Sequence, residues 1–144
     1  MAQISQILKD ISRFGRQYRE ARLAPLGITS RHGMYLREIS TTPGISQEQL
    51  AQRISINKSN VARQLAVLEE EGYIERRPCG QDRRALRLYP TEKTLALMPR
   101  IHTVLDAWEQ SLVAGFDPEE QQLLETMLLR LRDLAEEAAK EDVQ

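Results

Sequence analysis

Residues 45–90 read ISQEQLAQRISINKSNVARQLAVLEEEGYIERRPCGQDRRALRLYP, and this stretch decides the expected fold. Ser46, followed three residues later by Gln49, forms a capping box that predicts the start of a short helix. After a turn of about four residues, Asn57 is a suitable N-cap for a second helix, and Gly72 is suited to end that helix. Two helices joined by so short a turn predict a helix-turn-helix motif.

A hairpin is expected directly after this motif. Residues 74–77 can form one strand, and residues 85–89 alternate between apolar and polar side chains as a returning strand does. Between them, residues 78–82 have the composition of a loop. A helix-turn-helix followed by a hairpin is a winged helix-turn-helix, so this is the motif that the stretch predicts.

Helical segments are expected on both sides of the winged motif. Thr29 is an N-cap for a helix that ends near residue 40. A further helix is expected from about residue 91, with Pro99 either kinking it or marking its start one turn later. Asp117, with Glu120 three residues on, opens the last helix. The N-terminal helix is indicated by apolar residues on one face, namely Ile4, Ile7, Leu8, Ile11, Phe14 and Tyr18.

Composition limits the class of protein. The chain has 144 residues, of which 41% are hydrophobic and 28% charged, as in a single globular domain. Its longest apolar runs have four residues, far short of the ~20 of a membrane span, and the first 20 residues lack the apolar core of a signal peptide. One cysteine, Cys79, cannot form an internal disulfide. We therefore expect a cytoplasmic protein with no membrane partner.

The net charge of −1 hides a strong asymmetry along the chain. Residues 1–90 hold 15 basic and 9 acidic residues, whereas residues 91–144 hold 5 basic and 12 acidic ones. Such a division indicates that the first part meets a polyanion, although a chance separation of solvated faces would look the same.

The second helix of the pair has the pattern of a DNA-reading helix. If Val61 and Leu65 face the core, Ser59 and Arg63 lie on the opposite face, and no acidic residue occurs from residue 53 to 68. Arginine pairs with guanine and asparagine or glutamine with adenine in the major groove. The candidate DNA contacts on this helix are Asn57, Lys58, Ser59, Asn60, Arg63 and Gln64.

The hairpin adds five arginines within twelve residues, from Arg76 to Arg87. Arginine is drawn into narrow minor grooves, so the loop residues Gln81, Arg83 and Arg84 are further candidate DNA contacts. Asp82 is expected to hold the wing in shape by bonding backbone amides or a guanidinium. The alternative is a charged edge hairpin that resists aggregation.

Residues 45–98 resemble the MarR family of bacterial transcriptional regulators. The most specific pieces are LEEEGYIERR, QDRRA and TEKTLAL, and the flanking pieces ITSRHGMYL and FDPEEQQLLETMLLRL match as well. Two residues depart from the family pattern: Pro90 stands where an apolar residue is usual, and Thr94 where glycine is usual. The family residues carried over to this chain are Ser59, Asn60, Arg63, Asp82 and Arg84.

The resemblance implies a homodimer whose first and last helices interlock, with one winged helix per subunit on each operator half-site. The expected fold class is thus mainly α (α+β), with a DNA-binding domain over residues 29–99 and a helical dimerisation region over residues 1–28 and 100–144. It also implies a small effector, often aromatic and anionic, for which Tyr18, Arg22 and Tyr35 are the candidate pocket.

The sequence favours a regulator, with repression expected, over an enzyme. It contains no glycine-rich phosphate loop and no H-E-x-x-H motif, and we expect no cofactor. The two histidines, His32 and His102, do not predict a metal site, and His32 is expected to face solvent or a phosphate. A winged module that binds proteins instead of DNA is the competing interpretation.

Overall fold

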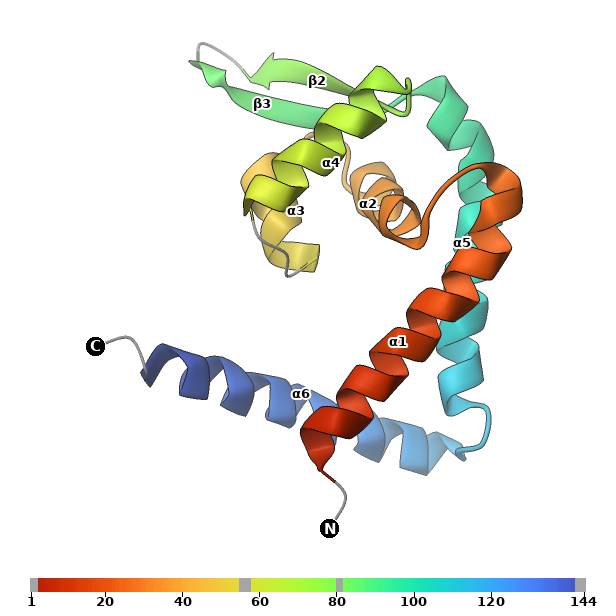
Figure 1. Ribbon diagram of the computed structural model, residues 1–144. Helices are drawn as coiled ribbons and strands as arrows, with labels where there is room; N and C mark the ends of the chain where they lie inside the picture. The colour runs from red at the N-terminus through yellow and green to blue at the C-terminus, as the bar shows by residue number, and fades with distance from the viewer. Residues whose placement is uncertain (1–2, 55–57, 80–81, 142–144) are drawn as a thin grey trace. The chain divides into compact units, whose positions relative to one another are not determined.

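The structure is a computed structural model that describes residues 3–54, 58–79 and 82–141; the side chains of residues 58, 79 and 82–85 also lie outside the described part. The chain divides into two compact units, Met1–Trp108 and Glu109–Gln144. In order, the elements are α1 (Ile4–Leu23), the 3-10 helix η1 (Ala24–Leu26), α2 (Ser30–Thr41), β1 (Ile45–Ser46), α3 (Gln47–Ile54), α4 (Lys58–Glu70), β2 (Ile74–Cys79), β3 (Asp82–Pro90), α5 (Glu92–Val113) and α6 (Pro118–Glu141) (Figure 1).

The predicted fold class is confirmed: α3 and α4 form the helix-turn-helix, and β2 and β3 form the wing. The expected helix ends are also in place. Thr29 Oγ1 accepts from the His32 amide at 3.0 Å, and Ser46 and Gln49 bond each other's amides at 3.1 Å. The cap predicted at Asn57 lies outside the described residues.

The sheet is larger than predicted. Its strand order is β1-β3-β2, all antiparallel, and the unexpected strand β1 pairs Ile45 with Leu88. The wing strands run beyond 74–77 and 85–89, so the predicted loop at 78–82 was too long. Pro78, which has no amide hydrogen, is accommodated by a register shift between Pro78 and Cys79.

Apolar packing in the first unit fixes the orientation of α4. Val61, Leu65 and Leu68 are completely buried, as the predicted inward stripe requires. They belong to one core with residues of α2, such as Leu36 and Ile39. Burial of a leucine is worth about 1.5–3 kcal/mol, so three such residues hold α4 firmly against the core.

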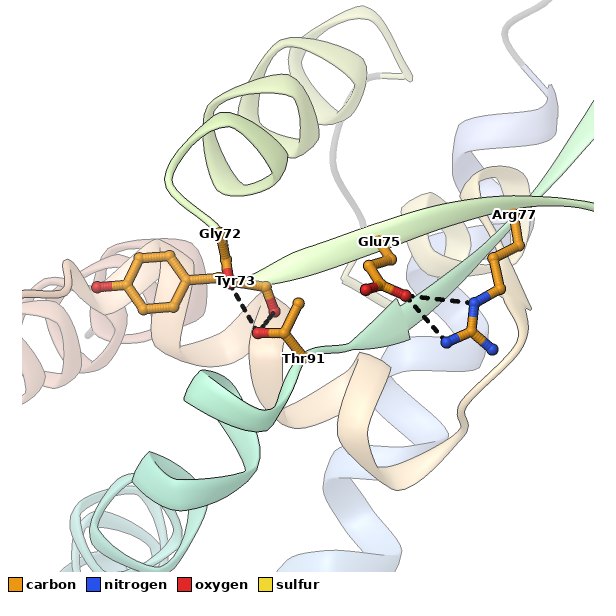
Figure 2. A network of polar contacts seen from close by, with 5 residues as sticks. All are labelled: Gly72, Tyr73, Glu75, Arg77 and Thr91. Atoms are coloured by element: carbon orange, nitrogen blue, oxygen red, sulfur yellow. Dashed lines mark hydrogen bonds and ion pairs between the residues drawn. The ribbon is translucent and has the colours of Figure 1, made fainter.

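The start of α5 is bonded to the turn that follows α4. Gly72 takes a left-handed conformation (φ 82°) there, and the Gly72 and Tyr73 amides bond the Glu69 and Leu68 carbonyls that end the helix. The single hydroxyl hydrogen of Thr91 is shared: Oγ1 lies 2.7 Å from the Gly72 carbonyl oxygen, its main acceptor, and 3.2 Å from that of Tyr73, as Figure 2 shows. The fully buried Thr94 donates to the same Tyr73 oxygen at 2.6 Å. A hydroxyl at this position therefore joins α5 to the turn between α4 and β2. Because α5 begins at Glu92, the interpretation that the helix starts at Pro99 is wrong.

We expect Thr94→Val to lower the free energy of unfolding by about 1 kcal/mol, because the buried hydrogen bond to Tyr73 is lost while the volume is kept. Urea unfolding at a fixed protein concentration measures the change. Thr103→Val is the matched control, since Thr103 bonds the Pro99 carbonyl within an exposed turn of the same helix. Equal losses in both variants would contradict a special role for Thr94.

The second unit contains α6, which begins with a capping box between Asp117 and Glu120 (2.8 and 3.0 Å). No residue of α6 is buried. Leu123, Met127 and Leu134 are 60%, 58% and 57% exposed, and their spacing places them along one line of the helix. Within the described ranges, no helix is long and apolar enough to cross a membrane.

Candidate nucleic-acid interface and the adjoining pocket

The exposed face of α4 carries the candidate base-reading residues. Ser59 and Arg63 are exposed, on the side opposite the buried stripe, and Asn60 is half-buried on the flank. Acidic residues occur only at the far end, at Glu69 and Glu70, which leaves the N-terminal half free of negative side chains. Such a helix can enter a major groove by its first turns, where the arginine reaches base edges.

The wing presents fewer available arginines than the sequence indicates. Arg76 lies 3.7 Å from Glu69 and is mostly buried, and Arg87 donates to the Gly44 carbonyl at 3.3 Å. Arg77 is bonded to Glu75 at 2.9 Å, as Figure 2 shows. Its guanidinium carbon also lies over the Tyr89 ring, 4.3 Å from the ring centre. These three guanidiniums are engaged within the protein, Arg76 with α4, Arg87 with the turn before β1 and Arg77 within the hairpin, so the tip residues are the better candidates for DNA.

Several predicted contacts cannot be placed further. Asn57 and Gln81 lie outside the described residues. The backbones of Lys58, Asp82, Arg83 and Arg84 belong to α4 and β3, but their side chains are outside the described part. Their roles stay predictions.

A pocket of about 530 Å³ lies beside the helix-turn-helix, entirely within the first unit. Arg16, Arg19 and Arg31 give it positive charge against a single carboxylate, Glu20. Its other lining residues are Ser12, Thr29, Ser30, His32, Met34, Tyr35, Ile54 and Gln64. Clefts of this volume hold small organic ligands, and this lining suits an anion with an apolar or aromatic body.

Tyr35 is the predicted pocket residue that does line this cavity. Its side chain is fully buried, and its hydroxyl makes no hydrogen bond with any residue that the structure describes. Burial raises the pKa of the Tyr35 phenol above its ordinary value of 10, against the opposing charge of Arg31. The phenol therefore stays protonated at neutral pH and keeps a hydrogen to donate.

Tyr18 and Arg22 are not among the lining residues of the pocket. The Arg22 guanidinium lies 3.5 Å from the centre of the Tyr18 ring, and that ring lies 5.4 Å from the ring of Trp108. The three side chains form a stack on α1 and α5 that packs the two helices together.

The structure also places His32 differently from the prediction. Instead of facing solvent or a phosphate, its ring is half-buried and bonds Gln64 of α4, with Nε2 and Oε1 2.8 Å apart. Gln64 was predicted to read a base, and that prediction stays open, although its amide oxygen is engaged here.

Comparison with known proteins agrees with this architecture. A model of the MarR family matches residues 26–85. The transcriptional regulator SlyA is 27% identical, with a TM-score of 0.89, over 95% of this chain and 96% of its own. MarR is 31% identical over 97% of this chain and 95% of its own, with a TM-score of 0.78. The chain belongs to the MarR family.

A more distant structure adds to the fold comparison. MepR of S. aureus, solved in complex with DNA, is 23% identical over 92% of this chain and 98% of its own, with a TM-score of 0.85. The MarR family consists of transcriptional regulators rather than enzymes. Among the described residues, no group of three or more His, Cys, Asp or Glu side chains could hold a metal ion.

The family resemblance did not reveal the arginine-lined wall of the pocket. Arg16 and Arg19 lie one turn apart on α1, a spacing that could have indicated a shared face. Arg31, in contrast, joins them only because α2 packs against α1, where the Ser30 amide bonds Glu20 at 2.8 Å and Arg19 bonds the Ser30 hydroxyl at 2.8 Å.

Proposed function

We propose that the protein is a homodimeric transcriptional repressor that binds a pseudo-palindromic operator. The observation that carries this proposal is the exposed, acid-free face of α4 with Arg63 and Ser59, set opposite a fully buried stripe. The DNA complex of MepR, which shares the fold, supports a DNA partner. Residues 29–99 would bind DNA in the cytoplasm, and two-fold symmetry would place the two α4 helices about 34–36 Å apart.

A second copy of the chain is the proposed occupant of the exposed apolar faces of α1 and α6. On α1, Ile4, Ile7 and Phe14 are 59%, 46% and 52% exposed. Exposed apolar surface of this extent usually marks an interface, and an obligate dimer buries upwards of about 2,000 Å². Residues 1–28 and 100–144 would then form the dimerisation region.

The pocket is the proposed site of a small aromatic anion that releases the operator. Three arginines supply charge for a carboxylate, and the buried Tyr35 hydroxyl behind the lining has no partner among the described residues that a ligand would have to displace. Met34 and Ile54 offer apolar contacts to the body of the ligand.

Selection from a library of random DNA duplexes tests the proposed function directly. The purified dimer should enrich a two-fold symmetric sequence. Its affinity for that duplex should fall steeply with salt, by about one unit of log–log slope per phosphate contact. A protein that enriches no sequence and binds random duplexes without salt dependence would instead be a module for protein contacts.

Tyr35→Phe tests the role of the buried hydroxyl. In the free protein we expect the free energy of unfolding to stay the same or rise by about 1 kcal/mol, because the variant removes a buried donor that lacks a partner. Calorimetric titration with benzoate should at the same time show weaker binding than in the wild type. A clear loss of stability without ligand would mean that the hydroxyl serves the fold.

A further inference from the structure

The pocket and the recognition helix meet at one hydrogen bond. His32 stands in the first turn of α2 and Gln64 in the middle of α4, and their side chains are bonded at 2.8 Å. Both side chains are half-buried and both line the pocket. Among the described lining residues, Gln64 is the one that belongs to α4, so a pocket ligand that contacts the DNA-binding helix contacts it here.

The chemistry of this bond makes it sensitive to an anion. The amide oxygen of Gln64 can only accept, so the shared proton is on His32 Nε2. A carboxylate drawn into the pocket by Arg16 and Arg31 is a stronger acceptor than an amide oxygen, since hydrogen bonds to charged groups are roughly twice as strong. It would therefore compete with Gln64 for the same N–H.

We propose that the His32–Gln64 hydrogen bond is the contact through which the pocket controls the recognition helix. With the pocket empty, the bond fixes the Gln64 side chain and so orders the face of α4 that binds DNA. An anion that accepts the hydrogen bond from His32 Nε2 in its place frees the Gln64 side chain, while the buried stripe keeps α4 on the core. A ligand shifts an equilibrium between two conformations only if it binds one of them more tightly than the other. Here the difference in binding is the hydrogen bond from His32, which the ligand receives only when Gln64 does not. The inference rests on the proposed function. His32 is thus a positioning residue, which acts on DNA through Gln64.

The first test is a double-mutant cycle on the duplex that the wild type selects. His32→Ala and Gln64→Ala should each weaken binding about 2- to 10-fold per half-site, the value of one hydrogen bond. The double variant should be no weaker than either single one, because both remove the same bond. His32→Gln, whose side-chain amide can donate, should recover part of the affinity. All variants should still unfold in one cooperative transition, with a melting temperature lowered by no more than the several degrees that the loss of about 1 kcal/mol produces.

The second test uses benzoate as the probe. Saturating benzoate should lower the affinity of the wild type for the duplex about 5-fold or more. Calorimetry should show that the Gln64→Ala variant still binds benzoate. Its affinity for the duplex, however, should no longer fall when benzoate is added. Gln52→Ala is the matched control, since it removes the same side-chain amide at an exposed position of α3 outside the pocket lining, and it should respond like the wild type.

The outcomes separate the two levels of the proposal. A wild type that selects no duplex, or that neither binds nor responds to benzoate, overturns the proposed function and this inference together. The wild type may select a duplex and respond to benzoate, while the losses of DNA affinity in His32→Ala and Gln64→Ala multiply in the double variant. In that case the inference alone is wrong. It is equally wrong if Gln64→Ala changes base preference while His32→Ala does not, because Gln64 would then read a base independently of His32.

Discussion

Replacing Arg63 by alanine is expected to weaken binding to the selected duplex by about 1–3 kcal/mol per half-site, mostly as lost discrimination at one base pair. Arg63 is exposed on α4, and the residues that hold the helix, Val61 and Leu65, face the core. Truncating the side chain should therefore leave folding intact. Titration of the variant against single-base changes of the duplex measures both the affinity and the discrimination.

Arg84→Ala is the matched comparison, because it removes the same guanidinium from the wing. We expect it to weaken binding to selected and scrambled duplexes alike, since wing arginines mainly contact the backbone or follow groove shape. If Arg63→Ala also lost the same affinity for selected and scrambled duplexes, Arg63 would no longer count as a residue that reads a base. Ser59 and Asn60 would then be the main remaining candidates.

Local chemistry explains why much of the fold could be predicted. Capping depends only on residues three positions apart along the chain. The capping boxes that begin at Ser46 and Asp117 and the N-cap at Thr29 each formed as the sequence indicated. The inward stripe of α4 follows from helical spacing alone. The ends of β2 and β3 were harder to predict, because the pairing with β1 and the register shift at Pro78 depend on partners that are distant in sequence.

The pocket shows where sequence reasoning stopped. Its wall combines residues of α1, α2, α3 and α4, and nothing local in the chain connects His32 with Gln64, which are 32 positions apart. Tyr35 could be anticipated from its place on α2. Tyr18 and Arg22 share their helix with Arg19 but lie outside the lining, which shows that proximity along a helix does not decide which side chains reach a cavity.

A single acidic residue on α6 is expected to have the largest effect on the protein. Met127 lies between Leu123 and Leu134 on the exposed apolar line, so Met127→Glu would place a carboxylate from each subunit inside the proposed interface. An uncompensated buried charge costs about 3–5 kcal/mol, which should convert the dimer to a monomer at micromolar concentration in sedimentation equilibrium.

Loss of the dimer should also weaken binding to the operator. Two linked winged helices bind a symmetric operator far more tightly than one does, typically by 10²–10⁴-fold, so Met127→Glu should lose about that factor although no DNA contact is altered. Gln122→Glu adds the same charge to an exposed position of α6 away from the apolar line, and it should remain dimeric with wild-type affinity for DNA.

If Met127→Glu stays a dimer, the line of Leu123, Met127 and Leu134 is not the interface. If it becomes a monomer that still binds the full duplex with wild-type affinity, two-fold recognition is wrong, because one winged helix would then suffice.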